Sequence, residues 1–298
     1  MVIKNLNYFI EKAKNTDTKK LVVAAAEDEP VLSAISEAKK ENIIEPILVG
    51  NAKKIENISS TLNFSLDGIE IINEENPANS CRIAVKLVRE GKAQILMKGL
   101  VGTADYLRAI LDKENGLRKG DLLSHIGCFE LKNYHKILSL TDAAQNIAPT
   151  LEEKVSIINN SVDFLRHLGI EKPKIACVAA VETVTTKMQA TVDAALLTMM
   201  NRRNQIKGCI IDGPLGFDNA ISLEAAQHKG IISEVAGDPD LILTPDIQSG
   251  NVLYKSFTYM AGGTVAAVIL GATVPVILTS RADTDRSKLT SIALAACY

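Results

Sequence analysis

The most informative absences in this sequence are the signatures of common catalytic sites. It contains no GxSxG, HExxH or GxGxxG pattern, so it indicates neither a hydrolase nucleophile elbow, a helical zinc site nor a dinucleotide fingerprint. The five cysteines are scattered and none forms a CxxC pair. They predict neither a disulfide framework nor a zinc site, and are interpreted as reduced, mostly buried thiols. We therefore expect no metal and no tightly bound cofactor.

The sequence also lacks the features of membrane and nucleic-acid-binding proteins. No apolar run approaches the ~18 residues of a membrane-spanning helix, and residues 1–15 show no apolar segment followed by a cleavage site. Lysine and arginine are spread along the chain, aromatic residues make up only 4%, and the formal charge is −2. Such a pattern does not favour nucleic acid binding. We expect a cytoplasmic protein with small-molecule substrates, and with neither membrane nor nucleic acid as a partner.

What is present is the composition and rhythm of a folded α/β protein. The 298 residues are 47% apolar and 23% charged, which suffices for a large core and for one or two domains. Short apolar, β-branched runs alternate with amphipathic helical stretches from residue 21 onward, as in βαβ units. The rhythm changes over 126–142, where two β-rich runs joined across 132–134 predict an antiparallel hairpin. This break indicates that a second domain begins there.

A polar cluster follows the last apolar run, in TVPVILTSRADTDRSK (273–288). Ser280, Arg281 and Asp283 come directly after a predicted strand, and ligands of open α/β sheets collect at the carboxyl ends of strands. These residues are therefore a candidate site. The alternative is structural: Asp283 or Thr284 caps the last helix, and Arg281 is a solvated surface charge.

A second candidate is the loop KGLVGT after the apolar run 93–97. Lys98, Gly99 and Thr103 precede a helix that carries Arg108, and glycine turns at a helix N-terminus suit an anion. The alternative is a tight turn with Thr103 as N-cap and Lys98 solvated. The run 241–245 likewise leads into Gly250, Asn251 and Lys255. Cations, hydroxyls, amides and glycine turns without metal ligands suit a phosphate-bearing substrate that is held by charge and position.

At this point the chain resembles the phosphate acetyl/butyryltransferases. The resemblance covers essentially the whole sequence and rests on blocks in the family order: AAAEDEPVLSAI, ILVGNAKKI, ILMKGLVGTADYLRAIL, GLRKGDLLSHIGCFE, INNSVDF, IKGCIIDGPLGFDNAIS, TPDIQSGNVLYK and LTSRAD. The MKGLVGTADYLR, DGPL and TSRAD wording looks most like the butyryl-transferring branch. The resemblance implies an isocitrate/isopropylmalate dehydrogenase-like fold of two α/β domains around an active-site cleft. The expected domains are residues 1–120 with 267–298, and residues 121–266 with the hairpin near 126–142.

The resemblance also implies a reaction, acyl-CoA plus phosphate to acyl phosphate plus CoA, by direct attack in a ternary complex. CoA and phosphate would be substrates rather than bound cofactors. By match of position, Ser280 would hydrogen-bond the reacting centre, and Arg281 and Arg108 would hold phosphate oxygens. Gly250, Asn251 and Lys255 would line the cleft from the second domain. A homo-oligomer, at least a dimer, is implied in the same way.

The chain departs from the family pattern at two points. Ser287 stands where the acetyl branch has its proposed aspartate base, which leaves Asp283 and Asp285 as the nearest carboxylates, and Asp283 is favoured because it lies closer to the strand end. A second family arginine has no counterpart. The alternatives are an acetyl-transferring enzyme, an NAD-dependent dehydrogenase of the same fold, or a non-catalytic CoA-binding protein.

Overall fold

The computed structural model describes residues 2–278 and 284–298. Within them the chain divides into two compact units. The terminal unit comprises Asn7–Asp121 and Ala266–Tyr298, and the middle unit comprises Leu122–Val265 together with the residues up to Leu6.

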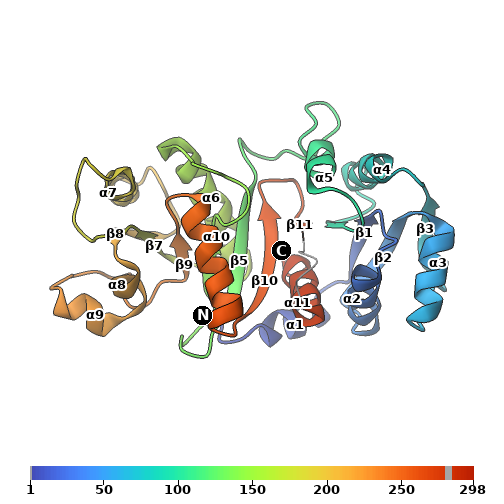
Figure 1. Cartoon of the computed structure of the whole chain (residues 1–298), viewed down its shortest axis with the longest axis horizontal. Helices are drawn as coiled ribbons and strands as arrows, with labels where there is room; N and C mark the ends of the chain where they lie inside the picture. The colour runs from blue at the N-terminus through green and yellow to red at the C-terminus, as the bar shows by residue number, and fades with distance from the viewer. Residues whose placement is uncertain (1, 279–283) are drawn as a thin grey trace. The chain divides into compact units, whose positions relative to one another are not determined.

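The terminal unit is built on a mostly parallel sheet in the order β3-β2-β1-β4-β11-β10, in which only β10 runs antiparallel to its neighbour β11. Helices α4 and α5 lie on one face, and α1, α2, α3 and α11 on the other (Figure 1). This is the doubly wound arrangement that alternating strands and helices favour. The elements are β1 (Lys19–Ala24), β2 (Ile44–Gly50), β3 (Glu70–Asn73), β4 (Ile95–Lys98), β10 (Thr264–Leu270), β11 (Val276–Ile277), α1 (Asn7–Lys14), α2 (Glu29–Lys40), α3 (Ala52–Thr61), α4 (Pro77–Arg89), α5 (Thr103–Ile110) and α11 (Asp285–Ala296).

Local sequence signals explain where these helices begin. The side chain of Asn76 accepts hydrogen bonds from the backbone N–H groups of Ala78 and Asn79, and Pro77 occupies the first turn of α4, where no N–H is needed. In α2 the apolar positions Val31, Leu32, Ile35 and others recur at helical spacing and are buried. One face of each helix therefore packs on the sheet while its charged residues stay in solvent.

The middle unit has strands in the order β5-β6-β9-β7-β8. β5 pairs antiparallel with β6, with Gly127 opposite Leu140, and the remaining strands are parallel. The elements are β5 (Ser124–Glu130), β6 (Leu138–Thr141), β7 (Lys174–Val178), β8 (Ile210–Leu215), β9 (Leu241–Leu243), α6 (Leu151–His167), α7 (Gln189–Arg202), α8 (Phe217–Ile221), α9 (Leu223–His228) and α10 (Ile247–Lys255), which continues into a π-helical turn, Ser256–Met260.

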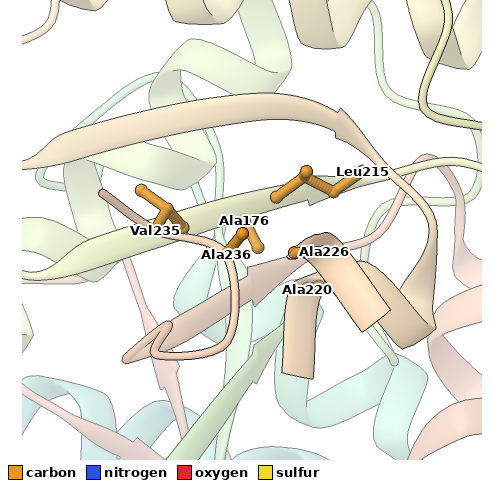
Figure 2. Packing of buried hydrophobic residues seen from close by; sticks show 6 residues of the cluster. All are labelled: Ala176, Leu215, Ala220, Ala226, Val235 and Ala236. Carbon is orange, nitrogen blue, oxygen red and sulfur yellow. The ribbon is translucent and has the colours of Figure 1, made fainter. Parts of the chain in front are cut away.

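In the core of the middle unit, strand β7 packs against helices on both of its faces. Ala176 packs with Leu215 of β8 and with alanines of α8 and α9 in one buried cluster (Figure 2). The next residue, Cys177, contributes instead to a small cavity beside α7. Successive side chains of a strand point to opposite faces, so both faces of β7 are covered by helices. All five cysteines are free and buried, as the sequence predicts.

The first residues differ from the expected boundary, because residues up to Leu6 belong to the middle unit and not to the terminal one. The carbonyl of Ile3 accepts a hydrogen bond of 2.7 Å from the backbone N–H of Ile137. The backbone N–H of Leu6 donates to Glu130 Oε2 at 2.8 Å. These two bonds hold the segment against β5 and the start of β6, a long-range pairing that no local pattern encodes.

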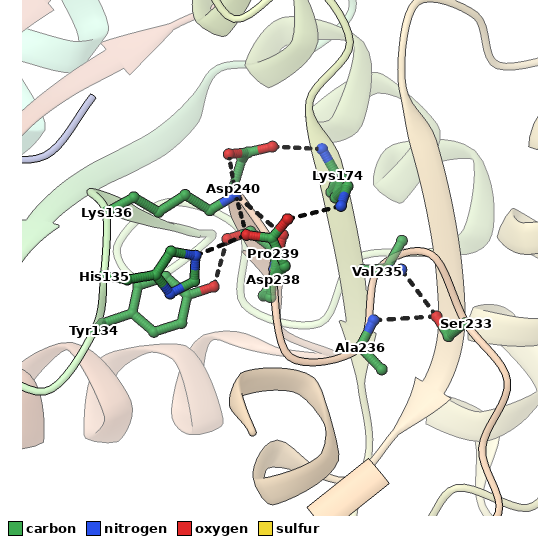
Figure 3. A network of polar contacts seen from close by, with 10 residues as sticks. All are labelled: Tyr134, His135, Lys136, Lys174, Ser233, Val235, Ala236, Asp238, Pro239 and Asp240. Carbon is green, nitrogen blue, oxygen red and sulfur yellow. Dashed lines mark hydrogen bonds and ion pairs between the residues drawn. The ribbon is translucent and has the colours of Figure 1, made fainter. Parts of the chain in front are cut away.

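A polar network connects the segments that precede β6 and β9 with Lys174, the first residue of β7. Asp238 accepts hydrogen bonds from His135, Lys136 and Lys174, and Lys136 also pairs with Asp240 at 2.6 Å (Figure 3). Partial burial by itself would raise the pKa of Asp238, but its three cationic or hydrogen-bonding neighbours lower it well below its usual range.

Nothing among the helices of the described residues is long and apolar enough to cross a membrane.

Candidate active site

Two of the sequence segments that carry predicted site residues of the terminal unit follow strands β4 and β11. The two strands run parallel with Ile277 opposite Met97, so they end at the same edge of the sheet. Ser280, Arg281 and Asp283 follow β11 and lie outside the described residues. The chain is described again from Thr284, the N-cap of α11, whose hydroxyl accepts a hydrogen bond from the backbone N–H of Ser287 at 3.1 Å.

Ser287 has a structural role in the first turn of helix α11. It is buried, and its carbonyl accepts a hydrogen bond from Ser291 at 2.7 Å. Its hydroxyl lies 3.1 Å from Thr284 Oγ1. Of the two residues that the sequence offered as helix cap, Thr284 fills that position.

Lys98 and Gly99 form a tight turn at the end of β4. The Lys98 ammonium donates to the carbonyls of Gly99 and Val101 at 3.1 and 3.0 Å. Gly99 lies against the backbone of Ala25: a Cβ at this position would lie 2.1 Å from the Ala25 carbonyl oxygen. Only glycine permits this approach, so the position of the Lys98 turn depends on it.

Helix α5 begins one residue earlier than a Thr103 cap would require. Gly102 is the N-cap and Thr103 is the first helical residue. Arg108 is exposed and pairs with Asp105 on the same helix. Tyr106 is fully buried, and its hydroxyl lies 3.4 Å from the carbonyl oxygen of Ile277, which is long for a hydrogen bond. Burial raises the pKa of Tyr106 well above its usual value, so it stays a neutral anchor that packs α5 beside the end of β11.

In the middle unit, Gly250 and Asn251 lie in α10 against the end of β6. A Cβ on Gly250 would lie 2.3 Å from the carbonyl oxygen of Asp142. Asn251 Nδ2 donates to the Ala143 carbonyl at 3.1 Å. Lys255 is the last residue of α10, exposed and one turn beyond Asn251. The amide of Asn251 is thus partly engaged in fixing the helix, whereas Lys255 faces solvent.

The N-terminus of α10 is capped by Asp246. Its carboxylate accepts hydrogen bonds of 2.8 Å from the backbone N–H and from the hydroxyl of Ser249. These bonds, the backbone one first, lower the pKa of Asp246 below its usual value. An ionised carboxylate at a helix N-terminus is also favoured by the helix dipole.

Asp142 is a structural hub that sequence reasoning missed. Its buried carboxylate accepts hydrogen bonds from the backbone N–H groups of His125, Ala144 and Gln145, at 3.1, 2.8 and 2.9 Å. Asn146 Nδ2 donates to it at 2.6 Å. The signal was present, since Asp142 directly follows an apolar strand, but its partners come from two segments that no periodicity connects.

A second missed feature is a buried ion pair beneath the end of β9. Lys154 of α6 and Asp193 of α7 lie 2.6 Å apart and are each less than a tenth exposed. Gln189 adds a hydrogen bond to Asp193 at 2.8 Å. Both residues lie within helices, on the buried side. A sequence pattern would place charged residues such as these on the solvent-exposed face of a helix.

The predicted residues that the structure describes belong to two units. In the terminal unit Lys98 ends β4, Gly99 follows it, and Thr103 and Arg108 belong to α5. In the middle unit Gly250, Asn251 and Lys255 belong to α10. Lys98 and Gly99 lie at the carboxyl end of β4, where βα loops present ligand-binding groups, whereas Arg108 and Lys255 lie in the last turns of α5 and α10.

Comparisons of the sequence and the structure with known proteins identify the relatives of this chain. The model of the phosphate acetyl/butaryl transferase family matches residues 5–80 and 74–296. The chain belongs to this family. It is 48% identical over 295 residues to a phosphate butyryltransferase of Clostridium acetobutylicum, covering 99% of this chain and 98% of the relative.

Solved structures agree with the membership. A branched-chain phosphotransacylase from Enterococcus faecalis has a TM-score of 0.84 and 33% identity, covering 94% of this chain and 98% of that one. A putative 4-hydroxythreonine-4-phosphate dehydrogenase from Salmonella typhimurium, 12% identical, still reaches a TM-score of 0.62 with 94% and 99% covered. That likeness concerns the fold alone. The family and the isocitrate dehydrogenase-like α/β fold predicted from the sequence are confirmed.

Proposed function

We propose that this chain is an acyltransferase that exchanges CoA and phosphate on a butyryl group: butyryl-CoA plus phosphate gives butyryl phosphate plus CoA, reversibly. The observation that carries the proposal is the 48% identity, sustained over 99% of the chain, to a phosphate butyryltransferase. The composition of the described site supports it, because Lys98, Arg108 and the glycine turns offer charge and backbone N–H groups to an anion.

In the proposed reaction a phosphate oxygen attacks the thioester carbonyl carbon. The new C–O bond forms through an oxyanion, the C–S bond breaks, and the CoA thiolate leaves with the electron pair. Arg281 and Arg108 would hold phosphate oxygens, and Ser280 would donate a hydrogen bond to the reacting centre. Lys98, Gly99 and Thr103, with Gly250, Asn251 and Lys255, would line the substrate site.

The reverse direction needs a base, because the thiol of CoA, with a reference pKa of ~8.5, is mostly protonated at neutral pH. We assign this role to Asp283. The hydrogen bonds of Ser287 in the first turn of α11 support the assignment, since they engage the residue that stands at the family's aspartate position.

Phosphate-dependent thiol release from acyl-CoA tests the proposal. We expect the highest kcat/KM with butyryl-CoA when acetyl-, butyryl- and isobutyryl-CoA are compared. Preference for acetyl-CoA would replace the butyryl assignment with acetyl transfer. Absence of thiol release with all three would leave a CoA-binding protein, and hydride transfer to NAD would indicate a dehydrogenase of this fold.

A further inference from the structure

Strand β8 stands at the end of the strand order of the middle unit. It pairs with β7, and no strand among the described residues pairs with its other side. The backbone N–H of Ile210 donates to the carbonyl of Pro173, on the β7 side. The backbone groups of Cys209, Ile211 and Gly213 therefore point outward. Such a row of outward N–H and C=O groups is a template for pairing with a strand of another molecule.

The side chain of Asn201 on α7 bonds to two of these outward groups. Its Nδ2 donates to the carbonyl of Cys209 at 3.1 Å, and its Oδ1 accepts a hydrogen bond of 3.1 Å from the backbone N–H of Ile211. A residue of a parallel strand would donate and accept at the same two positions, which flank the residue opposite it. The amide of Asn201 therefore occupies the place of one peptide unit of a neighbouring strand.

Thr198 extends this cover along the strand. It lies three residues before Asn201, on the same face of α7, and Figure 1 shows α7 beside β8. The buried hydroxyl of Thr198 lies 3.2 Å from the carbonyl oxygen of Gly213 and 2.9 Å from that of Ala194 in its own helix. We refer to Thr198 and Asn201 together as the edge cover.

The amide of Asn201 is held in place by a further bond. Its Nδ2 also donates to the carbonyl of Ile206, in the turn between α7 and β8, at 3.0 Å. The same side chain thus closes the turn and covers the strand. An experiment on the edge cover has to separate these two effects.

The β8 edge lies beside open surface. A groove of about 670 Å³ is lined by Ile210, Ile211 and Asp212 of β8, by the end of α7 and by residues 232–235. Ile232 is 100% exposed. An edge strand with apolar surface next to it is a site of association unless the protein blocks it.

We propose that the edge cover takes the place of a further strand and keeps the β8 edges of two copies of this chain from pairing. A twofold arrangement would bring β8 of one copy against β8 of the other in antiparallel orientation. With the cover in place, the outward groups of Cys209, Ile211 and Gly213 that it bonds gain little from such pairing. The inference is independent of the proposed function.

Two substitutions at one position separate edge cover from stability. Asn201→Ala and Asn201→Lys both remove the amide bonds, so both should lower the free energy of unfolding in urea. Only Asn201→Ala leaves an uncharged edge, because lysine adds a cation to a groove in which Lys172, Arg202 and Lys207 outnumber two carboxylates. Lysine on an edge strand discourages pairing.

Light scattering on the folded variants measures association. With rising concentration, the mass of Asn201→Ala should approach roughly double that of the unmodified chain, as twofold pairing requires. Asn201→Lys should keep the mass of the unmodified chain. Asn159→Ala, which changes an exposed asparagine of α6, is the control and should alter neither mass nor stability.

Hydrogen exchange shows where the copies meet. In Asn201→Ala the N–H of Ile211 loses its acceptor, so at low concentration residues 206–213 should exchange at least tenfold faster than in the unmodified chain. Exchange there should slow again as the copies associate, because the second strand supplies a new acceptor. Thr198→Val keeps the side-chain shape and removes only the hydroxyl. It should show the same trends more weakly, and it carries the test if Asn201→Ala does not fold.

Three results would overturn the proposal. Equal association of Asn201→Ala and Asn201→Lys would mean that lost stability, and not an open edge, drives assembly. Masses equal to that of the unmodified chain in all folded variants would mean that the edge needs no cover. Association of Asn201→Ala or Thr198→Val without renewed protection of residues 206–213 would place the contact elsewhere on the molecule.

Discussion

Among single residues, the proposed chemistry depends most on Arg281. If it holds substrate phosphate, Arg281→Lys keeps the charge but loses the two-pronged hydrogen bonding of the guanidinium. We expect the KM for phosphate to rise, or kcat to fall, at least several-fold, with little change in the free energy of unfolding. Initial rates at varied phosphate together with urea unfolding measure this. Unchanged phosphate kinetics would mean that Arg281 is a surface charge.

Asp283 carries the second prediction at this scale. Loss of a general base in Asp283→Asn should lower kcat for acyl phosphate plus CoA by on the order of 10²-fold. Raising the pH should restore part of the rate, because the thiol then ionises without help. Asp285→Asn is the matched control, with a carboxylate two residues away. Full activity of Asp283→Asn across the pH range would refute the assignment.

The residues predicted from sequence are those whose position relative to a strand end could be inferred. Lys98 and Gly99 follow the apolar run 93–97, and the structure places them directly at the end of β4. Asp142 also follows a strand, yet its role depends on donors from residue 125 and from 144–146 that meet only in the folded unit. A local sequence pattern does not encode long-range hydrogen bonds. The positions of Lys98 and Gly99 could therefore be predicted, whereas the role of Asp142 could not.

At the scale of elements, the Asp238 network should control acid stability of the middle unit. Because the folded-state pKa of Asp238 is lowered, the stabilisation is fully present above its unfolded-state pKa of ~4 and is lost as the pH falls below that value. Asp238→Asn should therefore be less stable than the unmodified chain at neutral pH, and the difference should shrink as the pH falls through ~4.

Urea unfolding at several pH values measures this effect. Asp17→Asn, which changes an exposed carboxylate in the loop between α1 and β1, is the control and should show no such pH-dependent gap. A gap between Asp238→Asn and the unmodified chain that is constant with pH would mean that the network does not depend on the charge of Asp238.

The pattern of elements was more accessible to sequence reasoning than their ends or partners. The change of rhythm over 126–142 corresponds to β5 and β6, which pair antiparallel. The sequence does not mark the helix N-cap at Gly102, because glycine carries no side-chain acceptor. Nor could the sequence show that Ile3 and Leu6 bond to a partner more than 120 residues away.

For the whole molecule, we propose a homo-oligomer, at least a dimer, as the family resemblance implies. Light scattering at micromolar concentration should give at least twice the chain mass of 32.1 kDa. Dilution should shift the mass if the association is weak. A single-chain mass throughout would contradict the proposal without affecting the assignment of the reaction.

The return of the chain to the terminal unit has a consequence during synthesis on the ribosome. β11 lies between β4 and β10, yet it is translated after all of residues 122–265. Until then the β4 edge has no permanent partner, and its backbone N–H and C=O groups are open to pairing with other chains. The contiguous stretch 122–265 can fold as it emerges, whereas the terminal unit must wait for its final segment. Nascent chains stalled before residue 276 should therefore be the species most dependent on chaperones, with the β4 edge as the surface to be protected.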